Sequence, residues 1–308
     1  MPIFATQNTS STPRRSKLRR IAAAGIAAMT ALTLSSCGLT QAGSATSDEK
    51  TISIIVTETP RYQEPTEIAR ELLAEEGWEL ETTYVTDIIQ PNEAVSQGEY
   101  DANFFQHAAY LRQFNEDNGT AVEPAFSVFY SPSGIFSLKY DSLEELPEGA
   151  KLSIPVDRSN NGRALHLLAE AGLIEVDESV EITELSQSDI TANPKSFEFV
   201  EVDQQSSART LPDVDAAFAF GSSVVEAGYD YDDVLLAVED HDDFFPFTVF
   251  LSVPEGERDS EKIRALQEAY QSPEVADWFA EYMNGVNEFS DHYTVDNVQE
   301  RWEEFLSK

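Results

Sequence analysis

The chain has 308 residues, a single cysteine and a formal net charge of −36. So acidic a chain is not expected to bind nucleic acid or an anionic lipid surface through its own charge. Because 41% of its residues are hydrophobic and 10% are aromatic, we expect one or two folded domains and not a disordered chain.

Residues 1–36 predict a secretory signal peptide. They contain no Asp or Glu, and five basic residues precede an apolar run at 21–34. This run is too short and too rich in Ala and Thr to predict a membrane span. It leads to Leu34-Ser35-Ser36-Cys37, a lipobox pattern in which the thiol is acylated and cleavage leaves Cys37 as the first residue. We therefore predict lipidation at Cys37, in preference to a transmembrane anchor or a buried cysteine.

Lipidation of Cys37 has consequences for the rest of the chain. Once its one thiol is acylated, the protein has no cysteine left for a disulfide, a thiolate metal site or a nucleophile. The acyl chains would anchor the protein to the extracytoplasmic face of the cell membrane without spanning it. Residues 37–50, rich in Ser, Thr, Gly and Ala, are expected to form a flexible tether between the lipid and the folded part.

Strand and helix patterns alternate from residue 51 onward. Strands are expected at 51–57, 79–85, 125–130, 134–139, 151–155, 180–185, 197–202, 215–220, 234–238 and 247–253. Helices are expected at 66–76, 105–117 and 162–171, followed by a helical tail from about 260 to 304. This alternation predicts an open α/β sheet and not a sandwich. We expect no internal repeat and no membrane span after Cys37.

Several sequence blocks in a fixed order give the chain a family resemblance. They are Gln-Pro-Asn at 90–92, Asp-Ala-Asn-Phe-Phe-Gln-His at 101–107, Leu-Glu-Glu-Leu-Pro at 143–147, Ser-Asn-Asn-Gly-Arg-Ala-Leu at 159–165, Ala-Gly-Leu-Ile at 171–174, Asn-Pro-Lys at 193–195 and Asp-Val-Asp-Ala-Ala at 213–217. With these blocks the chain resembles the NlpA-type family, the lipoproteins that serve methionine ABC importers. One block alone would be weak evidence, but so many in one order are specific.

The resemblance implies a type II periplasmic-binding-protein fold, in which two α/β lobes enclose a ligand cleft. We expect lobe one at 51–133 plus 247–308 and lobe two at 134–246, with hinge closure around the ligand. It also implies a substrate-binding lipoprotein that captures a small carboxylate-bearing solute, methionine or a related amino acid, and delivers it to an ABC permease. The chain has no P-loop, so ATP hydrolysis would belong to a separate ATPase subunit. An adhesin, a sensor or a scavenging lipoprotein that reuses the binding fold stays open as an alternative.

Arg163 is the first candidate for ligand binding. It follows Asn161-Gly162 at the predicted start of a helix, where a guanidinium and helix N-terminal amides can bind a carboxylate together. The resemblance implies that this position binds the ligand carboxylate, and the alternative is a surface arginine paired with one of the many acids. Asn160 and Asn161 could contact the ligand or support the loop, and the sequence leaves both possibilities open.

Aromatic and imidazole side chains are expected to form the wall of the pocket. The resemblance gives this role to Phe105, His107 and Tyr110, and we expect His107 and Tyr110 on one helix face. Without the resemblance, a histidine between aromatic residues more often lies in the core, with its ring nitrogens hydrogen-bonded, than in a ligand site. Phe104 is expected in the core.

Three positions depart from the family. Ile88 stands where the family has a pocket tyrosine, and Phe220 and Phe247 align with two asparagines that hold the bound amino acid. A ring offers no acceptor to a buried ammonium, whose desolvation is costly. The ligand would therefore be an apolar carboxylate, or an amino acid bound in a changed pose. A shifted alignment would instead bring Ser222 and Thr248 near the ligand, and their hydroxyls could accept from an amine.

No enzyme motif is recognised. The four histidines show no metal-ligand spacing, and the Gly-x-Ser-x-Gly pattern is absent. Residues 240–243, Asp-His-Asp-Asp, could hold a cation, but a solvated loop is the preferred interpretation. We therefore expect a binding protein without catalytic residues, a metal or a cofactor.

Overall fold

The structure is a computed structural model, and it describes residues 50–240, 244–282 and 286–308. The predicted signal peptide, Cys37 and all of the predicted tether except its last residue lie outside the described residues. So do three of the four residues in the acidic stretch at 240–243. Contacts group the described residues into one compact unit.

The first sheet has six strands in the order β13-β4-β12-β3-β1-β2. They are β1 Thr51–Thr57, β2 Glu79–Val85, β3 Ala102–His107, β4 Glu123–Tyr130, β12 Thr248–Val253 and β13 Glu288–Phe289. Strand β1 is parallel to β2 and β3, whereas β12 pairs antiparallel with β3 and β4. Every residue of β3 and β4 is buried, as expected for strands covered on both faces.

Helices cover both faces of this sheet. They are α1 Pro60–Glu75, α2 Gln90–Ser96, α3 Ala108–Asn118, α7 Glu261–Tyr270, α8 Pro273–Glu281 and α9 Val298–Leu306. Ile52, Ile54 and Val56 of β1 join the core with α1, α7 and α8. Ile55 points to the opposite face and joins the core with α2, α3 and α9. Because side chains alternate along a strand, the apolar run of β1 serves two cores.

The second sheet has five strands in the order β11-β5-β10-β6-β9. They are β5 Ser133–Phe136, β6 Lys151–Pro155, β9 Glu198–Val202, β10 Ala216–Phe220 and β11 Leu235–Val238. Strand β6 is parallel to β9 and β10, whereas β5 is antiparallel to β10 and β11. Strands β7 Glu175–Val176 and β8 Ile190–Ala192 form a separate pair.

Helices also cover the second sheet. They are α4 Arg158–Glu170, α5 Gly221–Glu226 and α6 Tyr231–Val234, with the 3-10 helices η1 Leu143–Glu145, η2 Ile182–Glu184, η3 Gln187–Asp189 and η4 Gln204–Thr210. Helix α4 packs on one face, and η4, α5 and α6 contribute to the core on the other. The close packing of α4 on η2 requires a glycine, since a Cβ at Gly162 would lie 1.8 Å from the carbonyl oxygen of Ile182.

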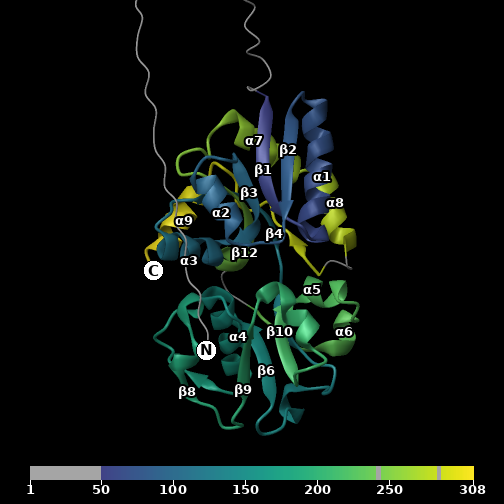
Figure 1. Ribbon diagram of the computed structural model, residues 1–308, viewed down its shortest axis with the longest axis vertical. Helices are drawn as coiled ribbons and strands as arrows, with labels where there is room; N and C mark the ends of the chain where they lie inside the picture. Colours follow the sequence, from purple (N-terminus) through teal and green to yellow (C-terminus); the bar gives the residue numbers. More distant parts are fainter. Residues whose placement is uncertain (1–49, 241–243, 283–285) are drawn as a thin grey trace, which may run out of the picture. The chain divides into compact units, whose positions relative to one another are not determined.

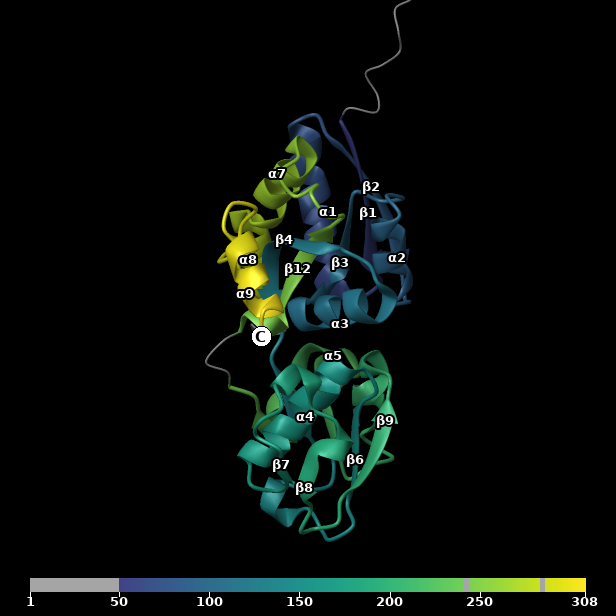
Figure 2. The same ribbon diagram turned by 90° about the vertical axis from the view of Figure 1, so that its left-hand side faces the viewer.

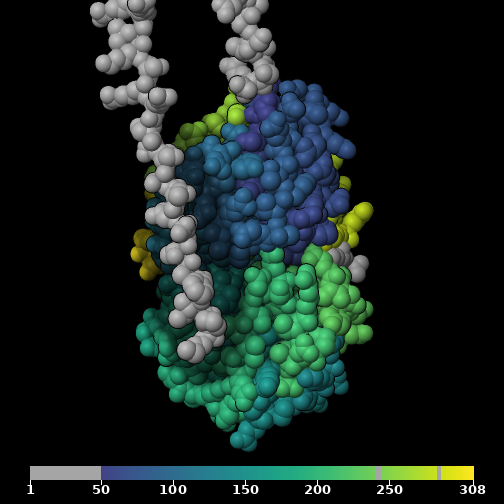
Figure 3. Space-filling model, viewed as in Figure 1, coloured from purple at the N-terminus to yellow at the C-terminus, as the bar shows by residue number. Residues whose placement is uncertain are grey.

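The chain passes between the two sheets twice, after β4 and after β11. We call residues 50–130 and 248–308 lobe one, residues 133–238 lobe two, and residues 131–132 and 239–247 the crossovers. Figure 1 shows the two lobes one above the other, and Figure 2 shows α3 at the edge of lobe one that faces α4. In Figure 3 the atoms of the two lobes touch along their boundary.

The predicted α/β class is confirmed, because parallel strands alternate with helices in both sheets. Two of the predicted elements are wrong. The expected strand at 180–185 contains η2 instead, which packs on α4 and not on a sheet edge. The expected helical tail is divided into α7, α8, β13 and α9, because Ser272 caps a new helix with Pro273 at its first position.

The expected helix at 105–117 is also wrong at its start. Strand β3 continues to His107 and α3 begins at Ala108, so Phe105 and His107 end a buried strand. They do not share a helix face with Tyr110. A short apolar run fits a buried strand as well as a helix, and periodicity alone does not separate the two. No helix among the described residues is both long and apolar enough to cross a bilayer.

Candidate functional site

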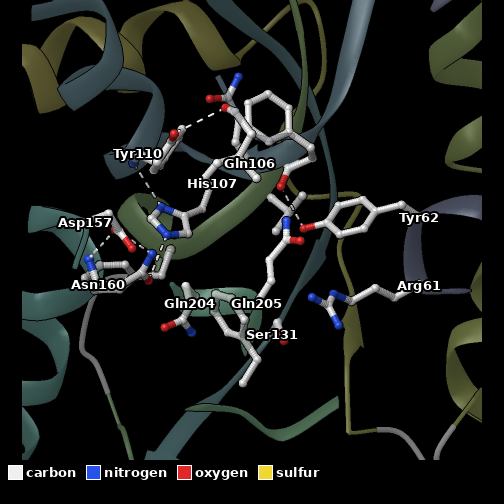
Figure 4. Close-up of a pocket in the computed structure, with 15 residues that line it drawn as sticks. Arg61, Tyr62, Gln106, His107, Tyr110, Ser131, Asp157, Asn160, Gln204 and Gln205 are labelled. Carbon is white, nitrogen blue, oxygen red and sulfur yellow. Dashed lines mark hydrogen bonds between the residues drawn. The ribbon is translucent and has the colours of Figure 1, made fainter. Parts of the chain in front are cut away.

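A cavity lies where the carboxyl ends of the parallel strands of both lobes meet. It is lined by Arg61, Tyr62, Ile88, Phe105, Gln106, His107, Tyr110, Ser131, Asp157, Asn160, Gln204, Gln205, Phe220, Phe247 and Val249. Figure 4 shows these residues around one space. The edge beyond the carboxyl ends of strands is the usual ligand site in open α/β proteins. Seven of the eight residues predicted from the sequence to contact ligand are among the lining residues, and Arg163 is not.

His107 connects the two lobes at this cavity. Its Nδ1 accepts a hydrogen bond from the backbone N–H of Tyr110 at 3.1 Å, which caps α3. The proton therefore belongs on Nε2, which lies 3.1 Å from the Oδ1 of Asn160 in lobe two. Burial, with a smaller contribution from the charge of Arg163, lowers the pKa of His107 to about 3. The imidazole is thus a neutral donor and not a cation.

Asp157 fixes the start of α4 and the position of Asn160. Its carboxylate accepts from the backbone N–H of Asn160 at 3.0 Å, the amide of Asn160 at 2.8 Å and the hydroxyl of Ser159 at 3.1 Å. Burial raises the pKa of Asp157 against the effect of these hydrogen bonds. Because of this cap, α4 begins at Arg158 and not at Gly162 as predicted.

The two asparagines of the Asn-Asn-Gly sequence have different roles. Asn160 lines the cavity and bonds to His107. Asn161 is not among the lining residues, and its amide donates to the backbone carbonyl of Pro155 at 2.8 Å. Of the two possibilities left open by the sequence, support of the local backbone fits Asn161, and contact with the ligand fits Asn160.

Arg163 lies in the second turn of α4, beyond the helix N-terminus where the sequence placed it. Its side chain is fully buried, and its guanidinium donates to both carboxylate oxygens of Glu239 and, at 3.1 Å, to Oδ1 of Asn160. The rings of Phe247 and Phe220 lie 4.3 and 5.6 Å from the guanidinium carbon. Arg163 is therefore held behind the lining and not exposed in the cavity.

Aromatic side chains provide most of the apolar lining. The ring of Phe105 meets that of Tyr110 edge to face with centroids 5.9 Å apart, and the hydroxyl of Tyr110 donates to the carbonyl of Ile88 at 3.2 Å. Phe220 and Phe247 both line the cavity. The alternative alignment gains no support, since neither Ser222 nor Thr248 is a lining residue.

A buried amide network joins two of the recognised sequence blocks. The amide of Asn92 donates to Gln106 at 2.7 Å, and its oxygen accepts from Gln106 at 2.6 Å and from Asn103 at 2.9 Å. Asn92 and Asn103 are completely buried. The network fixes α2 against the end of β3, and so holds the strand that carries Phe105 and His107.

Several lining residues were not found from the sequence. They are Arg61, Tyr62, Gln106, Ser131, Asp157, Gln204, Gln205 and Val249. All except Gln106 and Val249 follow the carboxyl end of a strand, by one to five residues. The predicted strand ends could have indicated several of them, because such positions meet at one edge of an α/β sheet.

Hydrogen bonds and ion pairs join the lobes on both sides of the cavity. On one side, Arg61 of α1 bonds to Ser222, Ser223 and Glu226 of α5. On the other, Arg112 of α3 donates to the hydroxyl of Thr183 at 2.6 Å and the carboxylate of Glu184 at 2.9 Å. The two lobes are therefore in a closed arrangement.

The described residues contain no group of three or more His, Cys, Asp or Glu side chains placed to hold a metal ion. Asp240 is the one residue of the 240–243 stretch that the structure describes. That residues 240–243 form a solvated loop therefore stays a prediction.

Comparison with known proteins identifies close relatives. The NlpA lipoprotein family model matches residues 52–288. The methionine-binding lipoprotein MetQ of Bacillus subtilis (strain 168) is 33% identical over 244 residues, covering 78% of this chain and 88% of that protein. The D-methionine-binding lipoprotein MetQ of Escherichia coli (strain K12) is 32% identical over 228 residues, covering 72% and 82%. A solved nutrient binding protein from Burkholderia cenocepacia bound to methionine has a TM-score of 0.72 and 31% identity, over 78% of this chain and 99% of that one.

Proposed function

This chain belongs to the NlpA lipoprotein family, and from this premise we propose that it is the substrate-binding lipoprotein of an ABC importer. It captures a small carboxylate-bearing solute and delivers it to a permease whose ATPase subunit supplies the energy. The relatives support a binding role and not catalysis, since they are named as binding lipoproteins. Methionine or a related amino acid is the first candidate ligand because two of those names specify methionine.

The observation that carries this proposal is the cavity at the carboxyl ends of strands from both lobes. Its lining comes from α1, β3 and α3 of lobe one and from α4, η4 and β10 of lobe two. A ligand there contacts both lobes at once, so it stabilises the closed arrangement and shifts the population toward it. The closed form would then dock on the permease, where ATP-driven changes reopen the lobes.

The lining favours a ligand with an apolar body and few polar groups. Ile88, Phe105, Phe220, Phe247 and Val249 provide apolar contacts, and Tyr110 adds a half-buried ring. We propose that His107 and Asn160 contribute the polar contacts from opposite lobes. Among the described residues that line the cavity, Asp157 is the one Asp or Glu, which makes it the candidate acceptor for a ligand ammonium.

The anchor completes the proposal. We propose that Cys37 is acylated and holds the protein on the extracytoplasmic face of the cell membrane, with residues 37–50 as tether. The membership in a lipoprotein family supports this placement.

A thermal-shift screen of residues 38–308 tests the binding function. The panel contains L- and D-methionine, other amino acids, hydroxy acids, keto acids and short peptides. A ligand that binds only the folded state raises the midpoint by mass action, about 2.7 kcal/mol of stabilisation at a hundredfold excess over Kd. We expect at least one carboxylic acid to raise the midpoint in a saturable way. If no acid in the panel changes the midpoint or gives heat in titration calorimetry, the proposed function is wrong.

A further inference from the structure

One side of the cavity contains buried polar atoms that the protein leaves unpaired. Ser131 is 4% exposed and Gln204 is 5% exposed, and both line the cavity. The hydroxyl of Ser131 and both amide atoms of Gln204 have no hydrogen-bond partner among the described residues. Buried polar atoms are nearly always paired, because an unpaired one is costly. These atoms therefore indicate a polar group of the ligand.

Arg61 lies at the same part of the cavity. Its Nη1 donates to the hydroxyl of Ser222 at 3.1 Å, in the first turn of α5. Ser131 reaches the same turn, because the carbonyl of the next residue accepts from the backbone N–H of Gly221 at 3.1 Å. The 3-10 helix that begins at Gln204 also packs against α5. Figure 4 shows Gln204, Ser131 and Arg61 in turn along the lower side of the space.

The other end of the cavity suits the carboxylate and the ammonium of an amino acid. Asn160 lines it, and its Oδ1 accepts from Nη1 of the buried Arg163 at 3.1 Å. Asp157, the candidate acceptor for an ammonium, bonds to Asn160. Both Asp157 and Asn160 lie on the left of Figure 4, and Arg61 lies on the right. An amino acid held at the left-hand end therefore has Arg61 at the far end, within reach of its side chain.

We propose that Arg61, Ser131 and Gln204 form a second polar subsite, which binds a neutral carboxamide at the end of the ligand's side chain. This inference rests on the proposed binding function and specifies the class of amino acid that the cavity takes. The carboxylate of the ligand stays at the end beside Arg163, where the family resemblance places it.

The donors and acceptors of the subsite match a carboxamide. The guanidinium of Arg61 supplies donors only, whereas the amide of Gln204 supplies both a donor and an acceptor. The hydroxyl of Ser131 can do either. A carboxamide has a carbonyl oxygen for the donors of Arg61 and an NH2 group for the acceptor of Gln204. An apolar side chain would leave all of these atoms unpaired.

The charge balance at Arg61 favours a neutral group over a second carboxylate. The carboxylate oxygens of Glu226 lie 3.2 and 3.3 Å from Nη1 of Arg61, and the hydroxyl of Tyr282 donates to Glu226 at 3.0 Å. The positive charge of Arg61 is therefore balanced within the protein. A ligand carboxylate at the same guanidinium would be repelled by Glu226, and a carbonyl oxygen would not.

Titration calorimetry with four L-amino acids of similar side-chain length tests this subsite. They are glutamine, its charged isostere glutamate, its apolar isostere homoleucine, and methionine. The variants are Gln204→Leu, Ser131→Ala, the two combined, and Glu226→Gln. The matched control is Gln97→Leu, which changes an exposed glutamine after α2 that is not a lining residue. Circular dichroism and urea unfolding verify that each variant is folded before its affinity is compared.

We expect the wild-type protein to bind glutamine at least about 10-fold more tightly than each of the other three, because none of them pairs the amide of Gln204 without repulsion from Glu226. The combined variant should weaken glutamine binding at least about 10-fold and change homoleucine binding less than about 3-fold. Gln97→Leu should behave as the wild type. Glu226→Gln should shift the ratio of the two affinities at least about 5-fold from glutamine toward glutamate, since it leaves Arg61 without its counter-charge.

Separate outcomes test the inference and the proposed function. If methionine or homoleucine binds as tightly as glutamine, or the combined variant keeps the preference for glutamine, the inference is wrong while the proposed function stands. The same holds if none of the four binds but another acid from the thermal-shift screen does. If Glu226→Gln leaves the ratio of glutamine to glutamate affinity unchanged, the side chain does not end at Arg61 and the inference is again wrong. If no acid binds at all, both are wrong.

Discussion

Glu239 and Arg163 form an ion pair in which the two side chains are 1% and 0% exposed. Glu239 lies in the second crossover, and its Oε1 also accepts from the hydroxyl of Tyr130 at 3.0 Å and the backbone N–H of Ser133 at 2.8 Å. Tyr130 and Ser133 flank the first crossover. One carboxylate thus connects α4 to both segments that join the lobes, which makes the pair a structural element of the hinge.

We predict that Glu239→Gln lowers the free energy of unfolding by about 3–5 kcal/mol, because it leaves the guanidinium of Arg163 buried without its counter-charge. Urea unfolding monitored by fluorescence measures this change. The double variant Arg163→Met with Glu239→Gln should be more stable than Glu239→Gln alone, since it buries no unpaired charge.

The control is an ion pair on the surface. Asp296→Asn removes a partner of Arg264 where the two side chains are 73% and 45% exposed, and it should cost less than about 1 kcal/mol. A loss for Glu239→Gln as small as that for Asp296→Asn would contradict a structural role of the buried pair.

The sequence predicted correctly those strands whose ends are marked by the neighbouring residues. Strands β1, β2 and β6 have the predicted bounds, since each is bounded by charged residues or turn formers. The last three residues of β3, Phe105-Gln106-His107, fall within the helix predicted at 105–117, and their sequence carries no alternation that would indicate a strand. Tertiary pairing with β1 and β12 determines its form, and this pairing is not visible in the local pattern.

The candidate site was harder to predict from the sequence, because its residues are brought together from distant parts of the chain. The partner of Arg163 is Glu239, 76 residues further along the chain, and the chain has 56 acidic residues from which to choose. Arg61 lies outside all the recognised blocks, so the resemblance did not indicate it. The structure identifies it because α1 begins at the end of β1, which places its first turn at the cavity.

The buried imidazole of His107 gives stability a specific dependence on pH. Its pKa is about 3 in the folded protein, against about 6.5 in an unfolded chain. Between these values the unfolded state binds more protons, so stability falls as the pH is lowered from about 6.5 toward 3. The slope approaches about 1.4 kcal/mol per pH unit within that window and vanishes outside it.

Comparison with His107→Gln isolates this contribution. Asp157 acts in the opposite direction, because its raised pKa favours the folded state as the pH falls. The quantity to measure is therefore the difference between the two proteins in free energy of unfolding from pH 7.5 to 4. Parallel curves for wild type and His107→Gln over that range would show that the imidazole is not held neutral.

The ion pair between Arg112 and Glu184 should contribute to ligand affinity without touching the ligand. It joins α3 of lobe one to η2 of lobe two, so an opening of the lobes would break it. We predict that Glu184→Gln weakens ligand binding about 2- to 5-fold, because a partly exposed pair contributes up to about 1 kcal/mol to the closed state.

A matched control for closure is Glu67→Gln, which removes an ion pair with Arg70 inside lobe one. Titration calorimetry should give this variant the affinity of the wild type. X-ray scattering without ligand should show a larger radius of gyration for Glu184→Gln than for Glu67→Gln. Equal affinities for the two variants would argue against a closed state held by this pair.

The predicted acylation of Cys37 would determine where the protein is found in a cell. We predict that Cys37→Ala abolishes incorporation of radiolabelled palmitate and lowers the share of the protein in the membrane fraction, because it removes the thiol to which the acyl chain would be attached. Ser36→Ala is the matched control, since it changes a neighbouring small residue and leaves the thiol in place. It should keep both the label and the membrane association. Ligand affinity should be the same for wild type and Cys37→Ala, since Cys37 precedes β1, the first element of the described fold. A Cys37→Ala variant that stays in the membrane fraction at the wild-type level would mean that something other than the acyl chain anchors the protein.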